Sequence, residues 1–385
     1  MHIIQVGPYP LDANCIRGGV ESSVYGLANA LAATHQVDVF DVPRIGGKDA
    51  VESQQPLTIH RYANHGKYNI EATQRLDDIL RDITALHPDV IHIHGTGDIS
   101  AVIYKALQLQ GFNVLLTVHG LLHVEKMNQL RKKFSLKHIY QYFHQSKTEF
   151  DLLSTTNHII VDTEYVAKQI ERLYKQRKIK HLPTMHVIPQ GINSAYFSIQ
   201  STPNENHILS IGAISERKGH LYLLKAFEQV AALMPSAKLT IAGSLADTNY
   251  YQQLQAFIAN SPYKDAISLA TNLPQEAIFD LYRSAKLFAL HSQEESQGIV
   301  FAEAMATGLP VVATNVGGVP YVVEHDRCGL LCNYSDSQTM AEMICRILSN
   351  KEQYDAFSTQ ALQAAKKYDW QEIAKQIETI YTKKI

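Results

Sequence analysis

The sequence has no run of about twenty apolar residues, which is the length that a membrane-spanning helix requires. Its first apolar segment, Ile3-Ile4-Gln5-Val6, is short and is typical of a strand rather than of an export signal. Cysteine is rare, and Cys328 and Cys332 have no second pair nearby to complete a zinc site. These absences predict a cytoplasmic protein that binds no metal.

The sequence also lacks a large net charge. Its formal charge of -2 gives no reason to expect binding to nucleic acid. The basic residues are nevertheless clustered. Six lysines or arginines lie between Lys126 and Lys147, and six more lie between Lys168 and Lys180. Each basic residue near an anionic lipid surface contributes about 1 kcal/mol. We therefore consider an anionic membrane surface as a partner, with a solvated helix face as the open alternative. Apolar residues interrupt the first cluster, namely Leu136, Tyr140, Tyr142 and Phe143.

A length of 385 residues is too great for one ordinary domain. Predicted strands and helices alternate along the chain, which indicates an α/β fold built from doubly wound sheets. A polar stretch without periodicity, Ser198 to Asn206, separates two parts of similar size. We expect an N-terminal domain at 1–198, a C-terminal domain at 199–369 and a ligand-binding cleft between them.

The first part contains the less certain assignments. A helix is expected over Ala72 to Leu86, but the region between it and the strand Val37 to Phe40 has no clear pattern. One long helix is expected from roughly Gln129 to Leu153. The segment from Leu121 to Leu130 is interpreted as a loop.

The most informative stretch runs from His291 to Gly318. A buried strand ends just before it, and a polar loop containing Glu295 follows. Gly298 then begins a short apolar helix that carries Glu303, and a second strand, Val311 to Ala313, comes next. Open α/β sheets bind ligands in such loops, outside the carboxyl ends of their strands.

The residue types in this loop suggest a particular ligand. Backbone N–H groups around Gln297, Gly298 and Ile299 are the donors of a helix start, which suits an anion such as phosphate. The carboxylates of Glu295 and Glu303 would repel phosphate but would bind hydroxyl groups, so a nucleotide sugar fits both features. Alternatively, Glu295 is a solvated loop charge and Glu303 an exposed helix residue. Glu303 stands among apolar residues, however, where a charge without a partner is costly.

Each domain also has a glycine-containing loop after its first strand. Gly18 and Gly19 precede a helix and would let the backbone approach an anion closely. In the second domain, the loop Gly212 to Gly219 carries Arg217 and Lys218, which could stabilise charge on a departing diphosphate. Ordinary solvated turns are the alternative interpretation for both loops.

Two histidines, His94 and His119, each end a predicted strand and are followed by glycine. We expect His119 to face the cleft and favour it over His94 as a site residue. The sequence Gly95-Thr96-Gly97 half matches a dinucleotide fingerprint, but it lacks the third glycine and the following acidic residue. A nicotinamide-dependent dehydrogenase is therefore disfavoured.

Together these pieces resemble the retaining glycosyltransferases of family 4, which have the two-domain GT-B fold. The strongest match is the pair Glu295 and Glu303, eight residues apart, within Glu-Ser-Gln-Gly-Ile-Val-Phe-Ala-Glu-Ala-Met-Ala-Thr-Gly-Leu-Pro-Val-Val-Ala-Thr. Four shorter segments support it: Gly18-Gly19, Thr117-Val118-His119-Gly120, Val187 to Asn193 and Lys218-Gly219.

The resemblance implies transfer of a sugar, with retention, from a nucleotide-diphosphate sugar to a glycan, a lipid-linked acceptor or another hydroxyl acceptor. It implies no metal and no cofactor, and the sequence has no Asp-x-Asp motif. Cell-surface polysaccharide or glycoconjugate synthesis would be the setting, with the enzyme peripheral at the inner membrane face. The helix at 370–385 would pack back onto the first domain.

The resemblance also implies a role for individual residues. Glu295 would hold hydroxyls of the donor sugar, and His119 would lie near the reacting carbon; these two are the catalytic candidates. Among the donor-binding candidates, Glu303 would hold the ribose and others would contact the diphosphate. The donor-binding candidates are Gly18, Gly19, Arg217, Lys218, Gln297, Gly298, Ile299 and Glu303. No enzyme nucleophile is expected, because the family is thought to use a front-side attack assisted by the departing phosphate.

One departure from the family pattern is important. Ala213 stands where the family usually has an arginine, and Arg217 is the candidate replacement. Two other protein classes stay open: a nucleotide-sugar epimerase of the same fold, and a non-catalytic sugar-binding protein, which would normally carry an export signal. The base and sugar of the donor and the identity of the acceptor are not specified by any motif.

Overall fold

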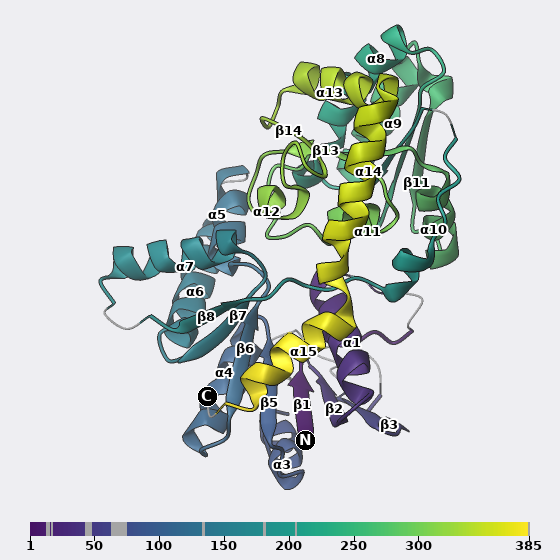
Figure 1. The fold of residues 1–385 in the computed structure, drawn as a ribbon. Coiled ribbons are helices and arrows are strands. Elements are labelled where there is room, and N and C mark those ends of the chain that lie inside the picture. The colour runs from purple at the N-terminus through teal and green to yellow at the C-terminus, as the bar shows by residue number, and fades with distance from the viewer. Residues whose placement is uncertain are drawn as a thin grey trace. The chain divides into compact units, whose positions relative to one another are not determined.

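The computed structural model describes residues 1–12, 16, 18–42, 48–62, 75–132, 135–179, 182–204 and 206–383. The chain forms two compact units, each with its own sheet (Figure 1). One unit is Met1–Gly191 together with Trp370–Ile385, and the other is Ile192–Asp369. The sequence put the change of domain at 198/199, seven residues beyond the point where the first unit ends.

The first unit contains an eight-stranded sheet, in which every neighbouring pair is parallel except β3 and β4. The strand order β3-β4-β2-β1-β5-β6-β7-β8 shows that the chain winds outward from β1 in both directions. This confirms the predicted doubly wound arrangement. The strands are β1 His2–Val6, β2 Gln36–Asp41, β3 Ala50–Gln54, β4 Leu57–Arg61, β5 Val90–His94, β6 Val114–Val118, β7 His158–Val161 and β8 Thr184–Val187.

Helices cover both faces of this sheet. On one face, α1 and α15 pack against apolar side chains of β1, β2 and β5, and the two helices lie side by side (Figure 1). On the other face, α3, α4, α6 and α7 cover a second apolar cluster. The helices are α1 Gly19–Ala32, α3 Leu76–Ala85, α4 Asp98–Leu109, α5 Leu122–Lys132, α6 Leu136–Leu153, α7 Glu164–Arg177 and α15 Trp370–Tyr381.

The C-terminal helix α15 is held to the first unit by its two ends. At its start, Trp370 fits where glycine leaves room: a Cβ atom on Gly26 or Gly191 would lie 2.0 or 2.5 Å from the indole. At its end, the hydroxyl of Tyr381 lies 2.7 Å from Nδ1 of His92 on β5. Helix α15 therefore belongs to the fold of the first unit although 178 residues of the other unit precede it.

Two local predictions in the first unit were wrong. The helix expected over Gln129 to Leu153 is two helices, α5 and α6, because Ser135 caps α6 by accepting a hydrogen bond from the His138 amide at 3.2 Å. The expected loop Leu121 to Leu130 is therefore mostly helix. Strand β3 had no recognisable pattern because it is an exposed edge strand, and β4 was missed although its residues alternate between buried and half-buried.

The second unit has six parallel strands in the order β11-β10-β9-β12-β13-β14. Helices α10, α11, α12 and α14 cover one face, and α8, α9 and α13 cover the other. Short 3-10 helices include η1 Ser194–Ser198 and η2 Glu216–Lys218. The strands are β9 His207–Ile211, β10 Lys238–Gly243, β11 Ile267–Thr271, β12 Leu287–Leu290, β13 Val311–Thr314 and β14 Gly329–Cys332. The helices are α8 His220–Leu233, α9 Thr248–Asn260, α10 Gln275–Ser284, α11 Ile299–Ala306, α12 Val319–Val323, α13 Ser337–Ser349 and α14 Lys351–Ala365.

The strand order reverses between β9 and β12. These two strands are neighbours in the sheet, although 75 residues separate the end of β9 at Ile211 from the start of β12 at Leu287. The loops that leave the carboxyl ends of β9 and β12 therefore lie next to each other. These are the loop containing Lys218 and the loop containing Glu295. In the described part of the chain, no helix is both long enough and apolar enough to cross a membrane.

Candidate active site

Tight backbone packing joins the two loops at this reversal point. Gly219 has φ +64°, and a Cβ atom there would lie 1.9 Å from the carbonyl oxygen of His291. The amide of Gln293 donates a hydrogen bond to the carbonyl oxygen of Arg217 at 2.8 Å. The position of η2 is thus fixed by the loop after β12, and η2 carries both cations of the site.

The carboxylate of Glu295 is the centre of this arrangement. Its Oε1 atom accepts hydrogen bonds from Nζ of Lys218 at 2.5 Å and from the hydroxyl of Ser292 at 2.7 Å. Its Oε2 atom lies 3.5 Å from Nη1 of Arg217. Burial would raise the pKa of Glu295, but the charges of Lys218 and Arg217 outweigh it and lower the pKa below its ordinary value. With 5% of its surface exposed, Glu295 is not a solvated loop charge.

The two cations have different surroundings. Lys218 is buried, and in the part of the chain that the structure describes its ammonium group has one hydrogen-bond partner, the carboxylate of Glu295. The side chain of Arg217 is 48% exposed and donates to the carbonyl oxygen of Glu294 at 2.8 Å. Arg217 thus points toward the Glu295 loop, whereas the methyl group of Ala213 offers no charge.

Helix α11 begins beside Glu295 with Gly298, whose φ of +82° is accessible mainly to glycine. No side chain of the described residues caps this helix. Within the described residues, the amides of Ile299 and Val300 have no hydrogen-bond acceptor. Their N–H groups and the helix dipole therefore favour an anion at this point. Gln297, the other predicted residue of this helix start, is 2% exposed.

Glu303 lies on the same helix, in surroundings that the sequence did not reveal. The hydroxyl of Tyr282 donates to its Oε2 atom at 3.1 Å, and Tyr196 also hydrogen-bonds the carboxyl. Burial raises the pKa of Glu303 to about 7, although both tyrosines and Lys218 act in the opposite direction. The alternative of an exposed helix residue is therefore excluded. Nothing in the spacing of Tyr196 and Tyr282 marked them as partners of this glutamate.

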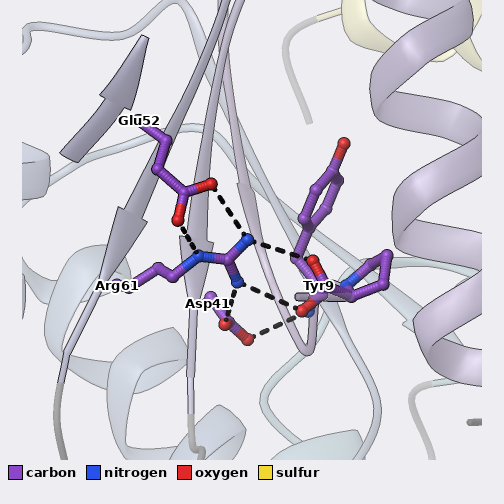
Figure 2. A network of polar contacts seen from close by, with 5 residues as sticks. Tyr9, Asp41, Glu52 and Arg61 are labelled. Carbon is purple, nitrogen blue, oxygen red and sulfur yellow. Dashed lines mark hydrogen bonds and ion pairs between the residues drawn. The ribbon is translucent and has the colours of Figure 1, made fainter. Parts of the chain in front are cut away.

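In the first unit, Gly18 and Gly19 are exposed and begin α1, for which the described residues provide no side-chain cap. The loop that leads toward them is held at its start by Arg61 (Figure 2). The Arg61 guanidinium donates to the carbonyl oxygens of Tyr9 and Pro10, and it pairs with Asp41 and Glu52. This buried cation thereby fixes the direction in which the loop leaves β1.

His119, at the end of β6, is held by His94, Gln190 and Asp162, whose Oδ1 atom lies 3.5 Å from Nδ1 of His119. Its Nε2 atom lies 3.1 Å from Nδ1 of His94. Gln190 donates through its amide nitrogen to Nδ1 of His119 at 2.9 Å and to Asp162 at 2.5 Å. Burial and the neighbouring histidines hold the pKa of His94 well below its ordinary value. His94, which the sequence favoured less than His119 as a site residue, is thus a direct neighbour of His119.

The structure thus groups the predicted residues in two sets. Seven lie in the second unit, at the carboxyl ends of β9 and β12 and along α11: Arg217, Lys218, Glu295, Gln297, Gly298, Ile299 and Glu303. Gly18, Gly19 and His119 lie in the first unit. Among the described residues, no group of three or more histidine, cysteine or acidic side chains could hold a metal ion.

Two doubly wound units, one with paired glutamates at its reversal point, define a protein of the GT-B class. The model of the family "Glycosyltransferase Family 4" matches residues 17–196, and that of "Glycosyl transferases group 1" matches residues 194–364. The chain belongs to the glycosyltransferases of family 4.

Curated relatives are similar at low identity. A D-inositol 3-phosphate glycosyltransferase of Corynebacterium urealyticum is 27% identical over 60% of this chain and 58% of its own length. An N-acetyl-alpha-D-glucosaminyl L-malate synthase of Bacillus anthracis is 24% identical over 84% of this chain and 82% of its own. The chain spans about half the length of several D-inositol 3-phosphate glycosyltransferases that it matches.

Solved structures share the fold over the whole chain. Sucrose-phosphate synthase from Thermosynechococcus elongatus has a TM-score of 0.78 and 22% identity, and the match covers 99% of this chain and 98% of that one. HepE from Anabaena, in complex with UDP and glucose, has a TM-score of 0.72 and 18% identity over 99% of both chains. At such identities the likeness concerns the fold alone.

Proposed function

We propose that this chain is a retaining hexosyltransferase that moves a sugar from a nucleotide-diphosphate sugar to a hydroxyl group. One observation carries the proposal: Lys218 and Glu295 form a buried pair beside the uncapped start of α11. A cation and free amides suit a diphosphate, and a carboxylate suits the hydroxyls of a sugar. The HepE complexes with UDP and with UDP-glucose favour uracil as the base of the donor.

In this proposal the diphosphate lies between Lys218 and the amides of Ile299 and Val300. An ammonium group has three N–H donors, and Glu295 uses one of them. As the bond to the sugar breaks, negative charge grows on the phosphate, and these donors stabilise it. The less occupied Oε2 atom of Glu295 would accept a sugar hydroxyl, and Glu303 would accept the ribose hydroxyls. His119 would lie at the sugar, and the departing phosphate would take the proton of the acceptor.

Release of UDP from UDP-glucose, UDP-galactose and UDP-N-acetylglucosamine tests this proposal. The wild-type protein should hydrolyse at least one of them slowly, whereas a sugar-binding protein would hydrolyse none. Glu295→Ala should abolish release while the protein stays folded by circular dichroism. Glu294→Ala is the matched control in the same loop and should keep the activity. Wild-type release by Glu295→Ala would refute the role of Glu295, and conversion of the donor to an epimer would favour the epimerase.

The acceptor side of the proposal rests on α6. Leu136, Tyr140 and Phe143 are spaced so that they share one side of the helix, and they are 85%, 68% and 66% exposed. Lys137 and Lys147 are exposed on the same helix. An apolar row with lysines beside it suits an anionic lipid surface. We therefore propose a peripheral enzyme that uses a lipid-linked acceptor in cell-surface glycan synthesis; its cytoplasmic location stays a prediction.

Sedimentation with liposomes tests the membrane step. The protein should sediment with vesicles that contain phosphatidylglycerol, less so at high salt, and not with pure phosphatidylcholine. Tyr140→Ser and Phe143→Ser together should weaken sedimentation, whereas Leu109→Ser, an exposed leucine at the end of α4, should not. If binding to the anionic vesicles is absent, a soluble hydroxyl acceptor replaces the lipid-linked one. The related enzymes named for D-inositol 3-phosphate and L-malate show the compounds to try first.

A further inference from the structure

A fully buried carboxylate, Glu149 on α6, joins two loops at the carboxyl edge of the first sheet. Its Oε1 atom accepts hydrogen bonds from the hydroxyl of Thr96 at 2.7 Å and from the amide of Leu122 at 2.8 Å. Its Oε2 atom lies 3.1 Å from the amide of His123 and 2.6 Å from Nδ1 of the same residue. Thr96 follows β5, and Leu122 and His123 begin α5 just after β6.

The number of these hydrogen bonds determines where the hydrogen lies in the contact between Glu149 and His123. A carboxylate has about four positions at which it accepts hydrogen bonds, and Glu149 has a partner at each of four. It has no position left for a proton of its own. Nδ1 of His123 must therefore carry the hydrogen in this contact, and in the neutral ring the lone pair is then on Nε2.

The Nε2 atom of His123 is available to a ligand. It has no hydrogen-bond partner among the described residues, and the side chain is 20% exposed. The neighbouring His119 differs, because both of its ring nitrogens are engaged by protein groups. A carboxylate that holds the other nitrogen fixes the orientation of an imidazole and its tautomer, as in catalytic triads and metal sites.

We propose that His123, positioned by Glu149, is a residue of the acceptor subsite. Its Nε2 atom accepts a hydrogen bond from a hydroxyl of the incoming acceptor, so the subsite takes polyhydroxyl compounds. This inference rests on the proposed glycosyltransferase function and assigns a binding role only, since the proton of the attacking hydroxyl leaves with the phosphate. The location agrees with it, because open α/β sheets bind ligands at the carboxyl ends of their strands.

The test uses glycerol as the probe, because the natural acceptor is unidentified. Incubated with the best UDP-sugar, the enzyme divides the sugar between water, as free sugar, and glycerol, as a glycoside. The wild-type protein should form more glycoside than the molar ratio of glycerol to water predicts. In His123→Leu that ratio should fall about fivefold, the factor that one neutral hydrogen bond contributes.

Further variants separate binding from folding. His123→Gln places an amide oxygen near the position of Nε2 and should restore most of the glycoside ratio. His35→Leu is the control, because His35 is also paired with a carboxylate, that of Glu378, but precedes the amino end of β2. Its glycoside ratio should equal that of the wild type. In labelled protein, nitrogen NMR should show the His123 hydrogen on Nδ1, and Glu149→Gln should alter that signal.

Each result has a definite meaning. An unchanged glycoside ratio in His123→Leu would overturn the assignment of His123, and so would a wild-type ratio no greater than that of the solvent. A hydrogen on Nε2 of His123 would also overturn it. If no UDP-sugar is turned over at all, the proposed function fails first, which is distinguishable because no free sugar appears.

Discussion

Replacing Glu303 by glutamine should stabilise the folded protein at alkaline pH and leave its stability almost unchanged at acidic pH. The reason is the environment of the carboxyl, which is partly buried among apolar residues of α11 and has the hydroxyls of Tyr282 and Tyr196 as partners. Burial raises the pKa of Glu303 to about 7. Glutamine has the same shape and can still accept the hydrogen bond from Tyr282, but it carries no charge.

The magnitude follows from linkage between protonation and folding. A carboxyl group whose pKa is higher in the folded state binds its proton more tightly there. Protonation of Glu303 therefore adds its full contribution to the free energy of unfolding at a pH below 4.5, the pKa of the group in the unfolded chain. That contribution is lost as the pH rises through 7. Because a tenfold change in a protonation equilibrium corresponds to about 1.4 kcal/mol, the ionised carboxylate costs the folded protein up to about 3 kcal/mol at pH 8.

The assay is urea unfolding of wild type and Glu303→Gln at pH 4.5, 6, 7 and 8, followed by circular dichroism. Tryptophan fluorescence is unsuitable, because the single tryptophan, Trp370, belongs to the other unit. Glu342→Gln, an exposed change on α13, is the control and should show no such trend. If the difference in unfolding free energy between wild type and Glu303→Gln is the same at pH 4.5 and pH 8, the carboxyl titrates normally and the reasoning is refuted.

Three further predictions concern the charged residues of the site in the second unit, two of them on donor binding and one on stability. UDP affinity should fall up to tenfold per pH unit below pH 7, because a protonated Glu303 accepts fewer ribose hydrogen bonds; calorimetry that shows a flat profile from pH 5.5 to 8 would contradict this. Lys218→Met should destabilise the protein by about 3–5 kcal/mol, because it leaves Glu295 buried without its close cation, and Lys218→Met with Glu295→Gln should recover much of the loss. Urea unfolding that shows additive losses would exclude such a coupling. Arg217→Ala should weaken UDP binding with little loss of stability, because the side chain is half exposed; unchanged affinity would show that Arg217 does not replace the arginine missing at Ala213.

The sequence predicted the second unit better than the first, for reasons that are physical. Helix α11 and strand β13 lie where the apolar runs after Gly298 and at Val311 to Ala313 indicated, since most residues of both elements are buried. In the first unit, the break between α5 and α6 depends on a single cap at Ser135, and β3 has no buried face to produce a pattern. The pattern of apolar residues in a sequence indicates which elements are buried. Features that bury few apolar residues, such as a helix cap or an exposed edge strand, cannot be predicted from it.

The candidate site shows the same limit. Lys218 and Glu295 could be recognised because each lies at a strand end in a recognisable loop, and the fold brings those loops together. The partners of Glu303 could not be recognised, because Tyr196 comes from η1 and Tyr282 from α10, both distant in sequence. Their hydroxyls meet the carboxyl only once the sheet has formed. No spacing rule connects such residues.

Three buried or half-buried glutamates differ in how their oxygens are occupied, and the difference indicates their roles. Glu149 accepts four hydrogen bonds from the protein, which leaves nothing for a ligand and suits it to hold His123. Glu295 is paired with cations, so it remains charged and retains an acceptor position on Oε2.

Among the described residues, Glu303 has two hydroxyl donors for about four acceptor positions, and burial raises its pKa because the charge is incompletely compensated. The two donors that it lacks are the number that the adjacent hydroxyls of a ribose would supply. A bound nucleoside would therefore complete the shell of Glu303 and lower its pKa. Binding of UDP at pH 6.5 should accordingly release protons, and calorimetry in buffers of different ionisation enthalpy should detect that release in the wild type but not in Glu303→Gln.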